Sequence, residues 1–572
     1  MPKILRVNLQ SQEITSEEII PTHPYVFFAG RALSSKIIVE EVPPKTDPLG
    51  RKNKLVFATG FLTGTPCPNS GRISIGAKSP LTEGIKESNV GGRAPALLGR
   101  HAIRAIICED IAENWMLLLV EHTGNIKIVT CDDLQSKNNY ELSFILRERY
   151  GKNCGIFSIG IAGEKCLKSA SIASIDMEGY PSRHAGRGGM GAVMGSKKLK
   201  AIVVQPPEKA KITYSDVKTF RTVSKTWGKA LYNAKRSFSK FGTLIGLTTM
   251  NSLNALPTQN YRRGSFQDVD KISAESLYDF ILENHGRNGI PCSPGCVIKC
   301  SNLLKNAKGE HITSSLEYET VALNGSNLLI NSIEKLAEID HVCDDLGVDT
   351  IEMGNAVGVF METGKIQWGD ADSVIDLIKG IEIDNPNSLV VAQGAFYAGA
   401  HFNISRVAHV KQQGLPGYDP RSFKGMGVTF ITSPMGADHT AGSAISGRNP
   451  YPDRPYGKVY EGEHKVSLSK ELQIFTMIHD AVGQCFFVGP TYESVPYLVQ
   501  LLNARYGWIL TPEELIDWSK SWIILERNFN DREGLLAVDN LPPFMLKEQL
   551  EDNPDRKWDV SADELAGYWK NF

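Results

Sequence analysis

Hydrophobic and polar positions form short runs along the first 207 residues of the chain. Apolar or alternating segments are bounded there by Gly, Pro, Asn and Asp, which is the pattern of strands joined by turns. The predicted strands are Ile4–Leu9, Ile37–Val42, Leu55–Thr59, Ile73–Gly76, Ala102–Ile107, Met116–Val120, Ile126–Val129, Ile156–Ile161 and Leu199–Val204. They favour a large two-sheet β domain over alternating β/α units, and Pro206-Pro207 marks its end.

Beyond residue 207 the apolar positions take helical spacing. One predicted helical face carries Val217, Phe220, Val223, Trp227 and Leu231. Further helix starts are indicated by a capping residue followed three positions later by an acid, at Asn331/Glu334, Asp349/Glu352, Thr511/Glu514 and Ser561/Glu564. The sequence therefore predicts an α+β fold with three domains: a β-rich domain at 1–207 and mainly helical domains at 208–408 and 409–572.

Charge and composition narrow the class of protein. The 572 residues include 62 Lys and Arg and 64 Asp and Glu, a net charge of −2, which argues against a nucleic-acid partner or an anionic membrane surface. The N-terminus lacks a secretory signal, and the apolar run Trp115–Val120 is far shorter than a membrane span, so we expect a cytoplasmic protein. Ten cysteines are too few for a disulfide scaffold, and free thiols would be available as metal ligands.

Three of these cysteines lie close together. Cys292, Cys296 and Cys300 stand within PCSPGCVIKCSN, where three thiolates can surround one face of an iron–sulfur cluster. The fourth ligand must then come from another part of the chain. The spacing differs from the loop of radical-SAM enzymes, and no second cysteine pair suggests zinc. The alternative is three unconnected buried thiols.

Two hexapeptides share the pattern D-x-x-G-x-[D/C]. They are Asp344–Asp349 and Asp480–Cys485. The glycine permits a sharp turn or a close approach, and the aspartate can accept the paired N–H groups of a flat heterocycle. In the first copy, Gly347 and Asp349 could instead be an ordinary helix stop and helix cap. The matching second copy favours two equivalent sites for a doubled ligand.

Glycine and arginine clusters add a feature of another kind. Residues 183–191, RHAGRGGMG, can form an anion-binding nest of backbone N–H groups flanked by arginine. Asn89–Arg93 and Ser70–Arg72 are shorter pieces of the same kind, each of which could be an ordinary turn. Together they favour a large phosphorylated cofactor lying across the β domain.

In combination these stretches resemble the aldehyde:ferredoxin oxidoreductase family. The resemblance rests on residues 59–82, 89–93, 183–202, the cysteine cluster with EYET at 317–320, and residues 343–349, 436–440 and 480–485, in the family's order. It implies a β domain that forms the base for the cofactor and two helical domains that enclose the active site. The implied cofactors are tungsten, or molybdenum, held by two molybdopterins, together with a 4Fe–4S cluster and magnesium.

The resemblance also implies roles for individual positions. Those near the pterins and their phosphates are Arg72, Asn89, Gly91, Gly92, Arg183, Ala185, Gly186, Arg187, Gly188, Gly189, Asp344, Gly347, Val348, Asp349, Asp480, Gly483, Gln484 and Phe486. Asn89 and Ala185 would bind magnesium through main-chain carbonyls, and Cys485 would be the fourth cluster ligand. Many relatives have a shorter gap between the first two cluster cysteines, and many have longer chains.

The implied reaction is oxidation of an aldehyde to its carboxylic acid with water as the oxygen source. Glu319 matches the family's catalytic glutamate, and Tyr318 and His439 are candidates to bind the carbonyl group or carry protons. Without the resemblance, Glu319 could be a surface acid and His439 a structural histidine. Electrons would leave through the cluster to ferredoxin or to an iron–sulfur partner subunit, in an anaerobic setting, and a homodimer or a hetero-oligomer is compatible with this route.

Two alternatives remain open from the sequence. The first is a reductase of a carboxylic acid or an aromatic acyl-CoA on the same cofactor. The second is an iron–sulfur electron-transfer subunit with an empty pterin site, which the intact Arg/Gly stretches and both D-x-x-G motifs argue against.

Overall fold

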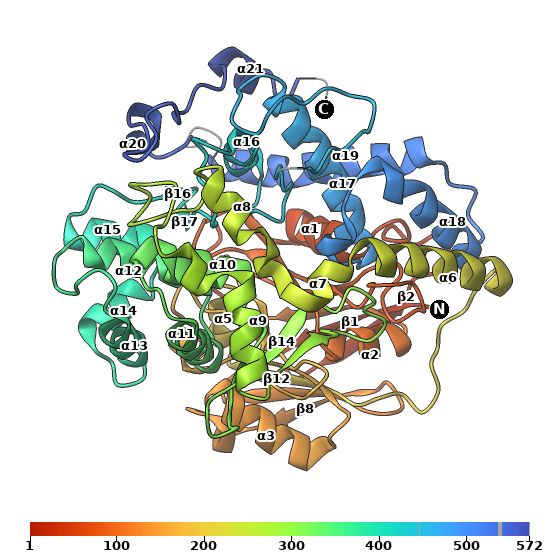
Figure 1. Cartoon of the computed structure of the whole chain (residues 1–572). Coiled ribbons are helices and arrows are strands. Elements are labelled where there is room, and N and C mark those ends of the chain that lie inside the picture. The colour runs from red at the N-terminus through yellow and green to blue at the C-terminus, as the bar shows by residue number, and fades with distance from the viewer. Residues whose placement is uncertain (446, 536–539, 571) are drawn as a thin grey trace.

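Two six-stranded sheets form the first part of the chain, as the computed structural model shows for residues 1–445, 447–535, 540–570 and 572 (Figure 1). The first sheet has the strand order β2-β1-β6-β3-β4-β5 and the second the order β8-β7-β12-β9-β10-β11. The strands of the first are β1 Lys3–Asn8, β2 Ile14–Glu18, β3 Leu55–Thr59, β4 Ile73–Lys78, β5 Ile85–Val90 and β6 Ile103–Glu109. Those of the second are β7 Met116–Val120, β8 Ile126–Thr130, β9 Gly155–Ser158, β10 Ile172–Ser174, β11 Arg183–Ala185 and β12 Leu199–Val204.

The two sheets have the same topology. In each, the first strand pairs with the second in antiparallel fashion and with the last in parallel fashion, β1 with β6 and β7 with β12. The remaining pairs also correspond, from β3–β4–β5 to β9–β10–β11. A short helix precedes the last strand of each sheet, α2 Ala94–Arg100 and α5 Met190–Ser196. The β domain is therefore a duplicated unit, a repeat that the sequence analysis did not detect.

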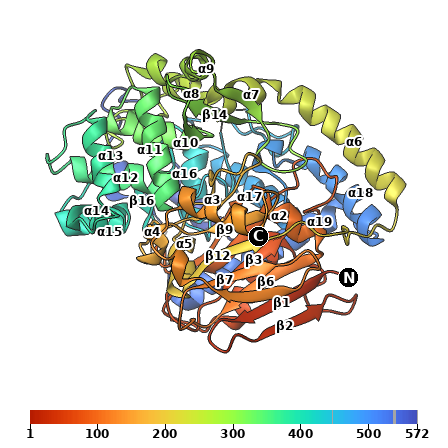
Figure 2. The same cartoon turned by 90° about the horizontal axis from the view of Figure 1, so that it is seen from below.

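A shared apolar core joins the sheets. Phe57 on β3 and Phe157 on β9 lie with ring centroids 5.4 Å apart, and both are fully buried. The outer face of the first sheet is covered by α1, Gly30–Glu41, which in turn packs against helices from the C-terminal part of the chain. Figure 2 shows the strands of both sheets together on one side of the molecule and the helices beyond them.

Helices dominate after residue 207. They are α6 Val217–Ala234, α7 Arg236–Phe241, α8 Leu247–Ser252, α9 Ala274–Glu283, α10 Tyr318–Asn324, α11 Ile333–Leu346, α12 Thr350–Met361, α13 Ala371–Lys379, α14 Pro386–Val391, α15 Ala395–Phe402, α16 Lys424–Thr432, α17 Lys465–Val482, α18 Val495–Tyr506, α19 Pro512–Glu533, α20 Pro543–Lys547 and α21 Ala562–Ala566. Two further helices, α3 Asn139–Tyr150 and α4 Ile161–Glu164, belong to the β domain. Small sheets are formed by β13 Arg287–Ile290, β14 Ser301–Lys305 and β15 His311–Ser314, and by β16 His409–Val410 and β17 Gln413–Gly414.

The remaining short elements are single 3-10 turns. They are η1 Asp132–Leu134, η2 Gly242–Gly246, η3 Val269–Ile272, η4 Ser326–Leu328, η5 Phe486–Val488 and η6 Tyr492–Ser494. Within the described residues, every helix is too short or too polar to cross a membrane.

The predicted fold class is confirmed, since a two-sheet domain is followed by mainly helical regions. Strands β3, β7 and β12 have the predicted bounds, and the apolar face of α6 is buried at Phe220 and Trp227. The capping box at Thr511 is present.

Two local predictions were wrong. Residues 37–42 belong mostly to α1, because Leu33, Ile37 and Ile38 repeat at helical spacing and are all buried. Asn331 does not cap α11: Ser332 does, through the backbone N–H of Lys335.

Candidate active site

A cavity of about 370 Å³ lies where the β domain meets the helices. This is within the usual range of roughly 300–1,000 Å³ for small-molecule sites. Edge strands β5 and β11 lie next to each other and supply one wall, and the start of α10 and the junction of α11 with α12 supply another. The predicted site residues in the lining are Arg72, Asn89, Gly91, Arg183, Gly186, Arg187, Tyr318, Glu319, Asp344, Val348, Asp349, His439, Cys485 and Phe486.

The other predicted positions are not among the residues that line the cavity. They are Gly92, Ala185, Gly188, Gly189, Gly347, Asp480, Gly483, Gln484, Cys292, Cys296 and Cys300. Several of these glycines shape the backbone: Gly188 and Gly189 take φ values of 80° and 75° just before α5. A left-handed backbone of this kind favours glycine.

The first D-x-x-G motif forms the junction between α11 and α12. Gly347 ends α11 with a φ of 76°, and the Asp349 side chain caps α12 by accepting the N–H of Ile351 at 3.1 Å. A Cβ on Gly160 of the β domain would lie 2.3 Å from the carbonyl oxygen of Leu346, so this turn is pressed against the β domain. The motif is therefore a helix stop and a helix cap, and its two aspartates still face the cavity.

The second D-x-x-G motif is seated on the first sheet in the same manner. Gly483 ends α17 with a φ of 80°, and a Cβ on Gly60 would lie 2.1 Å from the Gly483 nitrogen. Phe61 donates its N–H to the carbonyl of Ala481 at 3.0 Å, and Arg72 donates its N–H to that of Gly483 at 3.1 Å. Each motif is thus held by a glycine of one half of the duplicated base.

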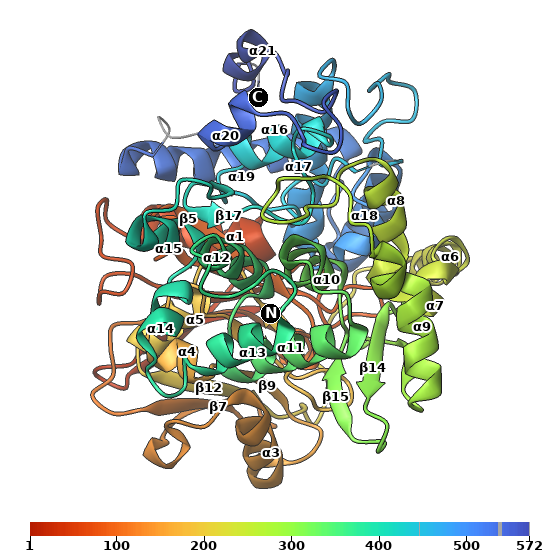
Figure 3. The same cartoon turned by 60° about the vertical axis from the view of Figure 1, so that its left-hand side comes forward.

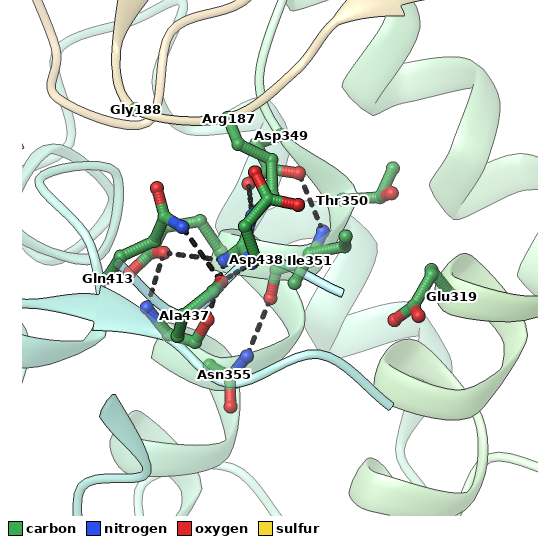
Figure 4. Close-up of polar contacts among 12 residues, drawn as sticks. Arg187, Gly188, Glu319, Asp349, Thr350, Ile351, Asn355, Gln413, Ala437 and Asp438 are labelled. Atoms are coloured by element: carbon green, nitrogen blue, oxygen red, sulfur yellow. Dashed lines mark hydrogen bonds and ion pairs between the residues drawn. The ribbon is translucent and has the colours of Figure 1, made fainter. Parts of the chain in front are cut away.

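Arg187 is held in the cavity wall by several hydrogen bonds and ion pairs (Figure 4). Its side chain donates to the carbonyl oxygens of Ala437 and Gly414 and pairs with Asp349 at 3.2 Å and with Glu352 at 3.5 Å. Burial disfavours its charge, but these carboxylates outweigh burial and raise its pKa. A fixed guanidinium at this point provides positive charge for an anionic group.

Two further arginines extend this positive wall. Arg72 donates to the side-chain oxygen of Asn89 at 2.5 Å and to its main-chain carbonyl at 3.2 Å. Arg183 pairs with Glu317 at 3.1 Å, while its Nε has no hydrogen-bond partner in the described part of the chain. An unpartnered buried donor in a cavity wall indicates a place for an acceptor from a ligand.

All four predicted cluster cysteines are buried, and their thiols lie close enough to influence one another's pKa. The Cys292 pKa is lowered, first by a hydrogen bond from Cys296 and then by Arg183 and Arg72, which act against burial. Burial raises the pKa of Cys485 to about 11.

Asn69 joins the two loops that carry these cysteines. It donates its N–H to the carbonyl of Gly295 at 3.0 Å and accepts the N–H of Cys485 at 2.8 Å. Its side chain lies 3.5 Å from the Cys296 sulfur and accepts the N–H of Val297 at 3.2 Å. Among the described residues no three His, Cys, Asp or Glu side chains are arranged to hold a single metal ion.

Glu319 and His439 face each other in the cavity. The His439 Nε2 lies 3.6 Å from Glu319 Oε1, and neither that oxygen nor the His439 Nδ1 has a hydrogen-bond partner within the described residues. Glu319 Oε2 accepts the N–H of Gly417 at 2.7 Å. Burial raises the Glu319 pKa above its usual value, although His439 and the Gly417 N–H oppose that rise.

Tyr318 has a different environment from its neighbour. Its hydroxyl group donates to the carbonyl of Gly417 at 2.6 Å, and its ring stacks on that of Tyr418. Because the same Gly417 also donates to Glu319, Tyr318 fixes the peptide that orients the glutamate.

Sequence reasoning missed a buried charge network beside the cavity. Arg31 pairs with Glu526 at 2.7 Å and with Asp480 at 3.3 Å. Lys86 pairs with Asp438, and burial raises the pKa of Glu87 next to it. Burial also raises the Asp480 pKa, and Glu87 adds to that rise.

The sequence pointed to this network only through the family resemblance. Asp438 lies inside residues 436–440, which carry that resemblance, whereas Lys86 and Glu87 lie between the similar stretches 59–82 and 89–93. Arg31 lies in the segment just before the one misread as a strand.

Comparisons with known proteins agree with this arrangement. Residues 4–206 match the family "Aldehyde ferredoxin oxidoreductase, N-terminal domain", and residues 222–570 match "Aldehyde ferredoxin oxidoreductase, domains 2 & 3". The chain is 31% identical over 598 residues to the tungsten-containing aldehyde ferredoxin oxidoreductase of Pyrococcus abyssi and 30% identical over 598 residues to that of Thermococcus kodakarensis. Each alignment covers 99% of this chain and 95% of the relative.

A solved structure shares the fold. It is described as the "Active site complex BamBC of Benzoyl Coenzyme A reductase in complex with 1,5 Dienoyl-CoA", with a TM-score of 0.80 and 17% identity over 96% of this chain and 92% of that one. At this identity the likeness concerns the fold alone. Since the matched regions extend over almost the whole sequence, the chain belongs to the aldehyde ferredoxin oxidoreductase family.

Proposed function

We propose that this protein oxidises an aldehyde to its carboxylic acid at a tungsten, or molybdenum, bis-molybdopterin centre. Electrons would leave through a 4Fe–4S cluster to ferredoxin or to an iron–sulfur partner subunit. The observation that carries the proposal is the pair of buried, unsatisfied groups, Glu319 Oε1 and His439, set in the cavity that both D-x-x-G turns approach. The names of the relatives from Pyrococcus abyssi and Thermococcus kodakarensis support tungsten and aldehyde chemistry.

The residues of the cavity fit a large anionic cofactor. Three buried or half-buried guanidinium groups, of Arg72, Arg183 and Arg187, line it, and the Arg183 Nε has no partner among the described residues. Arg448 also lines the cavity with an unpartnered Nη1 in the described part of the protein. Guanidinium groups are well suited to phosphate oxygens.

Each half of the base would hold one pterin. Asp344, Gly347 and Asp349 would serve one pterin, and Asp480 and Gly483 the other. Asn89 and Ala185 lie on the adjacent edge strands β5 and β11, one from each sheet, so their carbonyl groups could share a magnesium ion between the two phosphates.

The four cysteines fit a cluster rather than a disulfide pair or an inert core. Cys292, Cys296, Cys300 and Cys485 are all free and buried, and the backbone N–H of Lys299 lies 3.3 Å from the Cys296 sulfur. Hydrogen bonds to thiolate sulfur, such as this one, tune the potential of iron–sulfur clusters. Arg72 lines the cavity close to this group, since a Cβ on Gly91 would lie 3.2 Å from Arg72 Nη1 and 3.6 Å from the Cys292 sulfur.

When bound, the metal–pterin group supplies the two-electron redox chemistry. Glu319 is suited to take a proton from the attacking water, because burial makes its carboxylate more basic than an exposed one. Gly417 holds Oε2, which leaves Oε1 free for that proton. His439 is placed to bind the aldehyde oxygen or to carry the proton away. The net reaction consumes one aldehyde and one water and yields the acid, two protons and two electrons.

The test is elemental analysis of anaerobically purified protein combined with an aldehyde panel and benzyl viologen as acceptor. We expect tungsten or molybdenum with iron, and dye reduction that depends on aldehyde. Iron without either metal would contradict the proposal and favour the electron-transfer subunit. The same assay with reduced dye and a carboxylic acid or an aromatic acyl-CoA tests the reductase alternative.

A further inference from the structure

Helices α6 and α7 carry a run of positive charge with no acid inside it. Residues 217–241 contain seven Lys and Arg and no Asp or Glu, and the next acid along the chain is Asp268. The seven are Lys218, Arg221, Lys225, Lys229, Lys235, Arg236 and Lys240, which we call the α6–α7 basic surface. The whole chain has a net charge of only −2, so this positive charge is local.

The charges of α6 lie on one face. Lys218, Arg221, Lys225 and Lys229 recur at intervals of three and four residues, so they share one side of the helix. All four are exposed, whereas the opposite side of α6 is buried. Like charges four residues apart destabilise a helix slightly, and none of the seven forms an ion pair with a carboxylate in the described part of the protein. Lys235, Arg236 and Lys240 contact aromatic rings. Those contacts do not account for the row of exposed cations on α6.

This surface adjoins the proposed cluster. Ser239 on α7 donates to the carbonyl of Ile298, between Cys296 and Cys300, at 2.6 Å. A Cβ on Gly242 would lie 3.2 Å from the carbonyl oxygen of Cys300. The ring of Phe238 on α7 lies with its centroid 5.5 Å from that of Phe487, two residues after Cys485.

The cysteine loop itself reaches the surface between its buried thiols. Gly295 and Lys299 are exposed, and Lys299 adds an eighth cation beside the α6–α7 basic surface. Gly228 of α6 faces Pro68 of the loop that contains Asn69, since a Cβ there would lie 3.7 Å from the proline. In Figures 1 and 3, α6 lies along the outside of the molecule and α7 leads from it towards β14, the strand that follows the cysteine loop. The acids Glu275, Asp279 and Glu283 on α9 limit the surface on the far side of α7.

We propose that the α6–α7 basic surface docks an acidic iron–sulfur electron carrier over the cysteine loop. Positive charge around a redox site steers a negatively charged partner and orients its own cluster towards the loop. Electron transfer slows steeply with distance, so a carrier must approach where the cluster is nearest to solvent. Two oxidised carrier molecules would each take one of the two electrons released per aldehyde. This inference rests on the proposed function for its redox partner, but the binding surface can be tested separately.

The experiment compares holoenzyme with a charge-reversed variant, Arg221→Glu/Lys225→Glu/Lys229→Glu. The matched control is Lys52→Glu/Lys152→Glu/Lys379→Glu, which reverses three exposed lysines on other elements. The probe is a recombinant ferredoxin of net negative charge. Its binding is measured by calorimetry at low and high salt, and its aldehyde-dependent reduction is measured beside that of benzyl viologen.

We expect ferredoxin binding at low salt to weaken by about tenfold or more in the reversed variant and to be unchanged in the control. The difference should shrink at high salt, and dye reduction should stay at the wild-type level. Equal ferredoxin binding and reduction in all three proteins would overturn the docking proposal. Absence of aldehyde-dependent dye reduction in the wild type would instead refute the proposed function, and the binding measurement would still decide the role of the surface.

Discussion

The substitution Glu319→Gln tests the centre of the proposed chemistry while leaving the shape of the side chain unchanged. In the wild type, one carboxylate oxygen accepts the N–H of Gly417 at 2.7 Å and the other faces His439 at 3.6 Å without a hydrogen bond within the described residues. A glutamine can keep the bond to Gly417 through its carbonyl oxygen. What it loses is the free, basic oxygen.

The expected loss follows from that single change. General base catalysis is worth about 10²–10⁴ in rate, which corresponds to roughly 2.7–5.4 kcal/mol of activation free energy at about 1.36 kcal/mol per factor of ten. The fold should be unharmed. Because burial raises the Glu319 pKa in the folded state, the stability of the wild type falls as pH rises through that pKa. The amide removes this penalty, so the variant should be at least as stable at neutral pH.

The pH profile supplies a second readout. The wild-type rate should rise with pH along an acid limb that lies above the ordinary glutamate pKa of 4.5, and Glu319→Gln should lose this limb. The assay is aldehyde-dependent reduction of benzyl viologen, normalised to tungsten or molybdenum content. Glu334→Gln, an exposed acid in the first turn of α11, is the control. A fully metallated Glu319→Gln protein with more than about a tenth of wild-type activity would refute the role of the glutamate as base.

Three other changes test the structure around the site. Cys485→Ser should lose cluster iron and the visible absorbance of the cluster. The control Cys166→Ser should keep both. Unchanged iron in Cys485→Ser would rule out Cys485 as a ligand. Gly483→Ala should lower the thermal unfolding temperature. An alanine in this left-handed backbone costs about 1–2 kcal/mol. Its Cβ would lie 2.1 Å from the hydroxyl oxygen of Thr63, and relieving that clash costs about 1–3 kcal/mol more. Gly246→Ala, whose Cβ meets no atom within 4 Å in the described part of the chain, is its control. Arg31→Met should destabilise the fold by about 3–5 kcal/mol at neutral pH, because it removes the cation that pairs with the buried Glu526 and Asp480. The deficit should shrink on acidification as Asp480, whose pKa burial raises, takes up a proton. A loss that is independent of pH would contradict the ion pair with Asp480.

The sequence predicted much of the fold wherever burial and hydrophobic pattern agree. Strands β3, β7 and β12 are buried throughout and were found with their bounds. Strand β5 was missed because its sequence IKESNV is polar, yet Lys86, Glu87 and Ser88 are buried in it. These side chains face the cavity and its charge network instead of an apolar core, so their pattern resembles that of a surface loop.

The candidate site was likewise predicted only in part. Motifs with glycine, cysteine or paired aspartates can be recognised locally, and Asp349 and Cys485 do line the cavity. Partnerships between distant segments cannot be recognised in this way. Arg31 and Glu526 are far apart in the sequence, and only the packing of α1 against α19 makes them an ion pair.

The duplicated base has one further consequence, which concerns the loops that follow β3 and β9. These connections, residues 60–72 and 159–171, are equally long and lead to equivalent strands. In the first, Asn69 and Arg72 reach the cysteines, whereas at the matching positions of the second, Lys168 covers the ring of Tyr397 and Ser171 bonds to His184. The two connections differ in local structure, since the second contains α4, Ile161–Glu164, and the first only turns. If each half holds one pterin, as proposed above, the first connection is the one that links its half to the cysteines, so the two halves of the repeat would serve different roles.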